Sequence, residues 1–250
     1  MNDTGARKPR LLDVLRTFAA LAAILPGLLA GLWILLRRRN RRQALNRAIE
    51  LWGDLGTRAA GIDLRVEGAE HLELRPAVFV INHQSGIDPI LVCALLRRNF
   101  VGVAKVQIKS NPVLGPAFSF AETIFLDRED SEGASRSLAA AVETLNSGLA
   151  VAVAPEGTRS DSAAPGRFKA GAFRLALEAR VPVVPIVIHD AFRVLPSGAF
   201  VMRAGSVHVS VQPPISTTDW SAESIHHHVG AVERVFQKVI SSARWMVHDL

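Results

Sequence analysis

The feature that most constrains this chain is a long uncharged run near its N-terminus. It extends from Thr17 to Leu36 and reads TFAALAAILPGLLAGLWILL. A helix of about this length crosses the hydrocarbon core of a bilayer once. Basic residues flank the run on both sides: Arg7, Lys8, Arg10 and Arg16 before it, and Arg37, Arg38, Arg39, Arg41 and Arg42 after it. Because arginines, and no small-residue cleavage site, follow the run, a cleaved signal peptide is disfavoured.

We therefore expect residues 1–60 to form a membrane-associated helical segment. Positive charge on both flanks gives no inside–outside asymmetry. Pro26-Gly27 falls in the middle of the run, where a helix kinks or turns back. A re-entrant hairpin and a single kinked span both fit. The stretch 43–60 has helical apolar spacing, which fits either a core-facing helix or a helix in the lipid interface anchored by Trp52.

Composition narrows the class of protein further. Apolar residues make up 49% of the chain and the formal charge is +6. Such a charge suits nucleic acid, anionic lipid or an acidic substrate. Nucleic acid is the weaker alternative, because no base-stacking aromatic pattern accompanies the charge and tyrosine is absent. The single cysteine, Cys93, excludes an internal disulfide framework and lies in an apolar stretch, so we expect it to be buried.

Beyond residue 60 the chain alternates apolar strands with helical patterns. We expect strands at Asp63–Glu67, Ala77–Ile81, Phe100–Ala104, Ile124–Leu126, Leu149–Ala154, Val183–Ile188 and Ser206–Val211. We expect helices at Pro89–Arg97, Pro112–Phe120, Ser131–Ser147, Phe168–Ala179 and Ala222–Arg244. This order predicts an α/β domain over residues 61–250, with a mixed, largely parallel central sheet flanked by helices.

The first chemical motif, NHQSGID, follows the predicted strand that ends at Ile81. It places His83 at the carboxyl end of a strand, a frequent position for site residues in open α/β sheets. Asp88-Pro89 resembles a helix start, with the aspartate as N-cap. A turn at Gly86 would bring the carboxylate to the imidazole, which would then act as a general base. Taken alone, the spacing favours the alternative of a capping aspartate beside an incidental histidine.

The second motif, PEGTRS, also follows an apolar strand. Arg159 offers a planar guanidinium that suits a phosphate, and Thr158 adds a hydroxyl donor. Gly157 permits a tight turn whose backbone amides supply further donors. Glu156 would hold Arg159 or bind glycerol hydroxyls. An ordinary solvated turn with a surface arginine is the alternative.

Two shorter motifs carry less information. In IFLDR, Arg128 follows a short strand and is a candidate second phosphate ligand, although by itself the pattern fits a surface residue. VPVVP, at Val181 to Pro185, is a proline-bounded buried strand, which we interpret as structural unless it shapes a binding site.

Together these motifs resemble the glycerolipid acyltransferase family of the 1-acylglycerol-3-phosphate type. The family's four blocks are matched in order by NHQSGID, IFLDR, PEGTRS and VPVVP, over roughly residues 77–188. Lys105 and the FKAG that begins at Phe168 also look like the family. The chain departs from the pattern at Gly86-Ile87, where many members carry a bulkier pair, and at Glu122-Thr123, where a glycine is common.

The resemblance implies acyl transfer from acyl-CoA or acyl carrier protein to the sn-2 hydroxyl of lysophosphatidic acid, with no cofactor and no metal. His83 would be the base and Asp88 would orient it. Glu156, Gly157, Thr158, Arg159 and Arg128 would hold the acceptor, and Lys105 would face the oxyanion or a phosphate. The resemblance also implies membrane lipids as partners, with the site on the cytoplasmic face of a bacterial inner membrane.

Three alternatives stay open at this point. A related acyltransferase would use another acceptor, such as a lyso-ornithine lipid, another lysophospholipid or glycerol 3-phosphate. A hydrolase would pair His83 and Asp88 with Ser85, although the chain has no G-x-S-x-G elbow. A non-catalytic adaptor would bind anionic lipid through its basic face.

Overall fold

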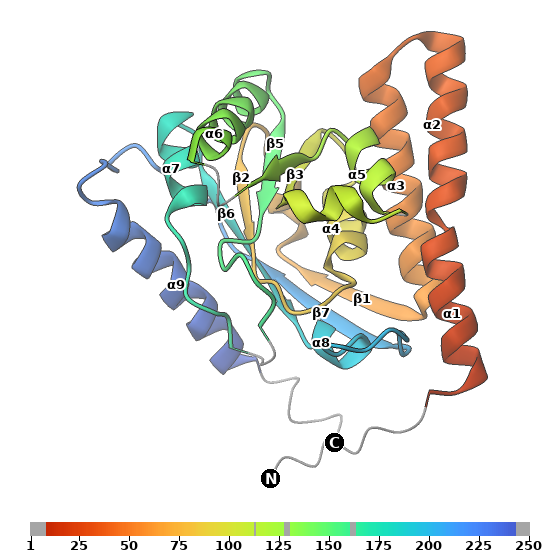
Figure 1. Cartoon of the computed structure of the whole chain (residues 1–250). Coiled ribbons are helices and arrows are strands. Elements are labelled where there is room, and N and C mark those ends of the chain that lie inside the picture. The colour runs from red at the N-terminus through yellow and green to blue at the C-terminus, as the bar shows by residue number, and fades with distance from the viewer. Residues whose placement is uncertain (1–8, 113, 128–130, 161–163, 244–250) are drawn as a thin grey trace.

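The computed structural model describes residues 9–243 except 113, 128–130 and 161–163 (Figure 1). Arg128 lies outside these described residues. The core element is a seven-stranded sheet in the order β1-β7-β6-β2-β5-β3-β4. All neighbouring strands run parallel except β6 and β7. The strands are β1 (Ile62–Glu67), β2 (Val78–Ile81), β3 (Phe100–Lys105), β4 (Ile124–Leu126), β5 (Ala150–Val153), β6 (Val183–His189) and β7 (Gly205–Val211). The predicted mixed, largely parallel sheet is confirmed.

Helices cover both faces of this sheet (Figure 1). On one face lie α3 (Arg41–Ala60), α4 (Asp88–Leu96) and α5 (Leu114–Phe120). On the other lie α6 (Ser131–Asn146), α7 (Gly171–Glu178) and α9 (Ile225–Ser242). Three short elements were not predicted: the 3₁₀ turns η1 (Ala69–Glu73) and η2 (Val106–Ser110), and α8 (Ala191–Val194). Each is about one helical turn long, too short to produce an apolar period.

The N-terminal run forms two helices in line, α1 (Leu11–Ala22) and α2 (Ile24–Arg38). They meet at Ala23, one turn before Pro26, because proline has no N–H for the carbonyl of residue 22 and its ring displaces that carbonyl. The chain therefore kinks at this point and does not turn back. It reverses only at Arg39, which is left-handed (φ 51), and Asn40, whose side chain caps α3.

The α1–α2 stretch has one apolar exposed face and one face of small buried residues. Leu11–Arg38 is long and apolar enough to cross a membrane, judged by length and composition. Its outward face carries Leu11, Leu12, Leu15, Phe18, Leu21, Leu25, Leu29, Leu32, Trp33 and Leu36. Its inward face lies so close to α3 that a Cβ on Gly27 would come within 2.6 Å of the Ala48 carbonyl oxygen. The apolar outer face is compatible with membrane association.

Helix α3 is a core helix, which settles the alternative between core and lipid interface. Trp52 is 8% exposed and makes an edge-to-face contact with Phe118, with ring centroids 6.3 Å apart. Of the two alternatives for this helix, the core-facing one is therefore confirmed, and Trp52 is not a lipid anchor. Ile49 and Trp52 belong to the same apolar cluster as the α4 and sheet residues. The predicted division at residue 60 thus runs through one continuous core.

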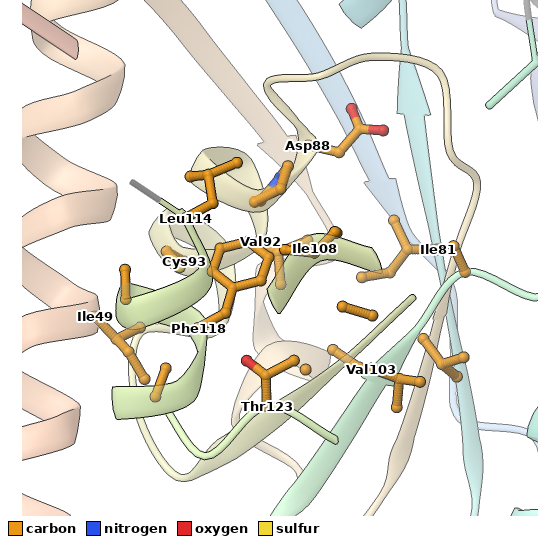
Figure 2. A pocket seen from close by; sticks show the side chains of 18 of the residues that line it. Ile49, Ile81, Asp88, Val92, Cys93, Val103, Ile108, Leu114, Phe118 and Thr123 are labelled. Atoms are coloured by element: carbon orange, nitrogen blue, oxygen red, sulfur yellow. The ribbon is translucent and has the colours of Figure 1, made fainter. Parts of the chain in front are cut away.

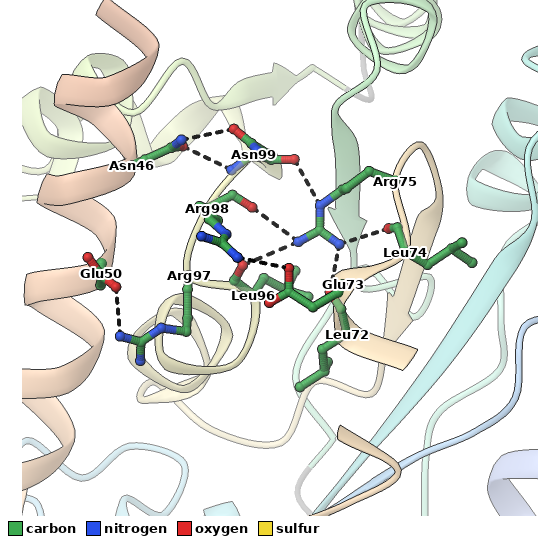
Figure 3. Close-up of polar contacts among 10 residues, drawn as sticks. All are labelled: Asn46, Glu50, Leu72, Glu73, Leu74, Arg75, Leu96, Arg97, Arg98 and Asn99. Atoms are coloured by element: carbon green, nitrogen blue, oxygen red, sulfur yellow. Dashed lines mark hydrogen bonds and ion pairs between the residues drawn. The ribbon is translucent and has the colours of Figure 1, made fainter. Parts of the chain in front are cut away.

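A polar network fixes the carboxyl end of α4 (Figure 3). The guanidinium of Arg75 donates to the backbone carbonyl oxygens of Leu72, Leu74, Leu96, Arg98 and Asn99. Burial lowers the pKa of Arg75. A cation at the end of a helix also satisfies carbonyl groups that have no partner within the helix.

The same end of α4 is tied to α3. Arg97 forms ion pairs with Glu50 at 2.8 Å and with Asp54 at 2.7 Å (Figure 3 shows the first). Asn46 donates to the Asn99 side chain at 2.8 Å and accepts from the Asn99 backbone N–H at 2.9 Å. Both ends of the connection between α4 and β3 are therefore held, which fixes the helix whose first residue is Asp88.

Candidate active site

The two main motifs meet at one edge of the sheet. Because β2 and β5 are parallel neighbours, the loops that follow them leave the sheet on the same side. The backbone N–H of His83 donates to the Glu156 carboxylate at 2.9 Å, and the backbone N–H of Ser160 donates to the His83 carbonyl at 2.8 Å. The PEGTRS loop thus holds the backbone of His83 from both sides.

His83 and Asp88 touch. The Nδ1 atom of His83 lies 2.5 Å from Oδ2 of Asp88. The same oxygen accepts the backbone N–H groups of Gln84 at 2.9 Å and Ser85 at 3.0 Å, and Asp88 is 5% exposed. With Nδ1 bonded to the carboxylate, the Nε2 lone pair is directed away from Asp88 and is the basic position of the ring.

The local reason for this contact differs from the predicted one. Asp88 was predicted as the N-cap of α4, but the helix begins at Asp88 itself and Ile87 occupies the cap position. The carboxylate turns back to the N–H groups of the preceding loop and to the imidazole, and does not cap the helix amides. Pro89 has no backbone N–H and therefore needs no acceptor in the first turn, which allows this arrangement.

Glu156 is placed to position the histidine loop. It is 5% exposed, and its second carboxylate oxygen accepts the Gly166 N–H at 2.8 Å while the first accepts that of His83. Burial raises the pKa of Glu156, and these two backbone bonds oppose that rise. Both oxygens are therefore used to join two loops, which makes Glu156 a positioning residue. Its predicted contact with glycerol hydroxyls is untested.

The other predicted ligands lie around the His–Asp pair. Gly157 is buried at a left-handed position (φ 74), while Thr158, Arg159 and Lys105 are exposed, and all four line the same cavity as His83. A Cβ on Gly86 would lie 3.5 Å from Nη1 of Arg159. The guanidinium of Arg159 therefore lies close to the turn between His83 and Asp88.

An apolar cavity of about 540 Å³ extends from this polar end into the protein. It runs between the sheet and the helices α2, α3, α4 and α5, and its walls include Ile49, Trp52, Val92, Cys93 and Phe118. Figure 2 shows Asp88 at one end of the cavity, with Val92, Phe118 and Ile49 deeper inside. Burial raises the pKa of the Cys93 thiol to about 12. The lining is thus mostly apolar and becomes polar at the end that carries His83 and Asp88, a composition typical of ligand-binding pockets.

The sequence analysis did not identify the residues that line this cavity, nor Asn82, which stabilises the strand next to it. Asn82 is fully buried; its side chain donates to the Ile188 carbonyl at 2.9 Å and accepts the Ile188 N–H at 2.7 Å, which ties the end of β2 to β6. A polar residue directly before His83, at the end of a buried strand, was the available signal.

The VPVVP strand is buried and contributes no cavity-lining residue, so its structural interpretation is favoured.

The structure excludes Ser85 as the nucleophile that the hydrolase alternative requires. This serine is 1% exposed, and its hydroxyl donates to the Leu195 carbonyl at 2.8 Å. A nucleophile must reach both the base and the substrate. Ser85 is sealed in the core and its hydroxyl is directed at Leu195, so it cannot act as the nucleophile in this structure.

A His–Asp pair lies at the polar end of an apolar cavity, on a largely parallel sheet, and this arrangement is compatible with an enzyme that transfers acyl groups. The comparison with protein families agrees: the chain belongs to the acyltransferase family, whose model matches residues 63–189. This stretch includes all four motifs, so the resemblance stated from them is confirmed.

Within the family, similar proteins share one name. The 1-acyl-sn-glycerol-3-phosphate acyltransferase of Limnanthes douglasii is 32% identical over 185 residues, which are 74% of this chain and 66% of that protein. The protein of that name from Saccharomyces cerevisiae is 32% identical over 66% of this chain and 55% of its own length. The matched region thus spans from about half to just under two thirds of these relatives.

A solved structure extends the likeness to the fold. The crystal structure of the 1-acyl-sn-glycerophosphate (LPA) acyltransferase PlsC from Thermotoga maritima superposes with a TM-score of 0.78 at 24% identity. The alignment covers 94% of this chain and 96% of that one. It therefore includes the N-terminal helices as well as the sheet.

Proposed function

We propose that this protein transfers a fatty acyl chain from a thioester to the sn-2 hydroxyl of 1-acyl-sn-glycerol 3-phosphate and forms phosphatidic acid. The observation that carries the proposal is the 2.5 Å contact between His83 and Asp88 at the polar end of the 540 Å³ apolar cavity. The names of the relatives in Limnanthes and yeast support the lysophosphatidic acid acceptor.

In this mechanism Nε2 of His83 takes the proton of the acceptor hydroxyl as its oxygen attacks the thioester carbonyl. Asp88 keeps the other ring nitrogen protonated and stabilises the imidazolium. Collapse of the tetrahedral intermediate breaks the C–S bond, forms the ester and returns the proton to the leaving thiolate. No acyl-enzyme is required, because the acceptor itself is the nucleophile.

Substrate binding follows from the two ends of the cavity. The apolar part would hold the acyl chain of the donor. Arg159 and Thr158, at the rim, would bind the acceptor phosphate, and Lys105 or the amide near Gly157 would stabilise the oxyanion. Arg128 stays a prediction as a second phosphate ligand, and so does the choice between acyl-CoA and acyl carrier protein as donor.

The apolar face of α1–α2 supports a membrane location. Both substrates of the proposed reaction are amphiphiles, so a protein fixed to the bilayer meets the acceptor where it resides. A cytosolic thioester donor would place the active site on the cytoplasmic side. The specific assignment to a bacterial inner membrane stays a prediction.

A product assay tests the proposal. Purified protein in lipid vesicles is incubated with radiolabelled acyl-CoA, with and without lysophosphatidic acid, and products are identified by mass spectrometry. We expect labelled phosphatidic acid only when the acceptor is present. Free fatty acid would indicate hydrolysis, and no product with either thioester donor would remove the proposal. A panel with lyso-ornithine lipid, other lysophospholipids and glycerol 3-phosphate separates the related acceptors.

A further inference from the structure

One exposed aromatic side chain lies outside the N-terminal helices. Within residues 9–243 as described, the exposed large apolar side chains all belong to α1 or α2 except Phe200, which is 90% exposed. It sits in the loop between α8 and β7. A single exposed apolar residue is ordinary on a protein surface. It is the position of Phe200 in the fold that indicates a function for it.

The loop has the composition of a membrane-contacting segment. Residues 195–202 read LPSGAFVM and carry no charge, while Arg193 and Arg203 stand on either side. A turn at Gly198 (φ 74), closed by the Ala199 N–H on the Pro196 carbonyl, projects the tip outward. An aromatic tip between arginines suits the boundary between acyl chains and headgroups.

The loop is fastened to α1. The backbone N–H of Met202 donates to the Thr17 hydroxyl at 2.8 Å in a buried contact, and the Gly205 N–H donates to the Gly61 carbonyl. A Cβ on Gly61 would contact both Ala204 and Arg16. Figure 1 shows the segment after α8 beside α1. The loop that carries the exposed tip is therefore held against α1, the helix that has Leu11, Leu12, Leu15, Phe18 and Leu21 exposed.

The same loop reaches the catalytic turn. The Ser85 hydroxyl donates to the Leu195 carbonyl, and a Cβ on Gly86 would lie 3.1 Å from Cδ2 of Leu195. The strand order explains this closeness: β7 starts at the sheet edge where β6 ends, and β2, which leads to His83, runs parallel to β6. The segment from Leu195 to Met202 therefore connects the catalytic edge with α1.

We propose that the 195–202 loop is a second membrane contact, which inserts Phe200 into the bilayer beside the apolar face of α1 and holds the His83 edge at the lipid surface. The bilayer is favoured over a protein partner because the loop is bonded to α1, and Leu11–Arg38 is long and apolar enough to cross a membrane and has basic residues at both ends. Its benefit to acyl transfer rests on the proposed function.

Site-specific labelling tests the contact without any activity assay. Cys93, the one cysteine in the sequence, is buried and its pKa is raised to about 12, so its thiol reacts slowly at neutral pH. Phe200→Cys can therefore be labelled selectively with a polarity-sensitive dye. Ala222→Cys is the matched control, because that exposed residue precedes α9 on the opposite side of the sheet.

Both labelled proteins are reconstituted into phosphatidylglycerol–phosphatidylethanolamine vesicles that contain a nitroxide lipid. We expect the Phe200→Cys label to be quenched several-fold more strongly than the Ala222→Cys label. Equal quenching at the two positions would overturn the proposal. The proposal would also be overturned if the emission of the Phe200→Cys label changed with protein concentration and did not change with nitroxide content, because that result would indicate a protein partner.

A second experiment measures the consequence for turnover. For Phe200→Ser, we expect kcat/KM to fall by about tenfold for an acceptor in vesicles. This matches the binding free energy lost when one aromatic side chain is no longer inserted into the bilayer. The value for a short-chain acceptor dissolved as a monomer should not change, and Phe200→Trp should restore the vesicle value. An equal loss on both acceptors would indicate a folding defect and count against the proposal. If the wild type transfers no acyl group, the proposed function fails while the quenching result still decides the membrane contact.

Discussion

The two faces of the sheet are filled in opposite ways. On the α6–α7–α9 face, aromatic rings interlock: Phe168 and Phe236 meet edge to face at 5.0 Å, and Phe173 packs beside Trp220. On the α3–α4 face the structure keeps a cavity of about 540 Å³. We call these the closed face and the open face. The tight packing of the closed face stabilises the fold, whereas the looser packing of the open face leaves a volume in which a ligand can bind.

The alternation of side chains along one strand encodes this difference. In β5, Val151 belongs to the cluster of the closed face and Ala152 to that of the open face. Gly102 of β3 is paired with Ala152, lines the cavity, and has nothing within 4 Å of the position where a Cβ would stand. Small residues on one side of two adjacent strands thus leave the space that larger residues fill on the other.

The largest effect is expected at the mouth of the open face. His83→Ala should lower the rate of phosphatidic acid formation by roughly 10²–10⁴-fold, the usual contribution of a general base. The thermal midpoint should stay near that of the wild type, because the His83 backbone bonds to Glu156 and Ser160 do not use the imidazole. His227→Ala, on an exposed part of α9, is the control. Turnover within a few-fold of the wild type would refute the base assignment.

On the closed face the expected effect is on stability. Phe173 is fully buried, and Phe173→Ala should lower the free energy of unfolding by about 3–5 kcal/mol through the cavity it leaves. Gly102→Ala, on the open face, should change it by less than about 0.5 kcal/mol, since its methyl group meets open space. Denaturation in detergent solution compares the two variants. Similar losses at both positions would contradict the contrast between the faces.

At the rim, the expected effect is on acceptor binding. Arg159→Ala should raise KM for lysophosphatidic acid by about tenfold or more, because a hydrogen bond to a charged group contributes about 1.5–3 kcal/mol. The control is Arg136→Ala, whose side chain is 68% exposed on α6 and remote from the cavity lining. An unchanged KM with a lowered kcat would move Arg159 from phosphate binding to transition-state stabilisation.

Inside the open face, Gly102→Leu should shorten the preferred acyl chain. The added side chain enters space that a long acyl chain would occupy, and each methylene that a pocket gains or loses is worth about 1–3 kcal/mol. The ratio of kcat/KM for hexadecanoyl-CoA to that for dodecanoyl-CoA should fall by about tenfold. Gly102→Ala should give a smaller shift in the same direction. An unchanged ratio would mean that the acyl chain does not reach the sheet at this point.

The strands were the part that sequence could predict best. Short apolar and alternating patterns placed all seven predicted strands within one residue of their observed ends, as for Ala77–Ile81 against Val78–Ile81. The spacing within NHQSGID allowed a contact between His83 and Asp88 but fitted a capping aspartate as well, and it was the ordered set of four blocks that favoured the contact. Each strand pattern and each block is a local signal, because it depends on residues adjacent in the chain.

Neither the cavity nor the side of α3 that faces the core could be predicted from such local patterns. The walls come from residues as distant in the chain as Trp52 and Phe118, and no local pattern reports their contact. Trp52 has arginines nearby in sequence, which suggested lipid, yet tertiary packing turns it into the core. For the same reason, the contacts of Glu156 with backbone amides of two other segments were not among its predicted roles, which were to hold Arg159 or to bind glycerol hydroxyls.

The smallest effect is expected at Glu122, which follows α5 near the inner end of the open face. Where the family often has glycine, this chain has a glutamate with left-handed backbone (φ 59), and its carboxylate pairs with Arg41 and Arg42, both at 2.5 Å. Left-handed backbone costs a non-glycine residue about 1–2 kcal/mol, and partly exposed ion pairs return about 0–1 kcal/mol each.

These two terms nearly cancel, so Glu122→Gly should change the free energy of unfolding by less than about 1 kcal/mol. Glu122→Ala loses both ion pairs but keeps the strained backbone, so it should be less stable than Glu122→Gly. Unfolding curves of the wild type and the two variants at low and high salt make the comparison. Salt weakens only the ion pairs of the wild type, so it should narrow the gap between the wild type and Glu122→Ala and should raise the stability of Glu122→Gly relative to the wild type. If alanine and glycine prove equally stable, the left-handed backbone at residue 122 costs no stability, and backbone strain does not oppose the ion pairs.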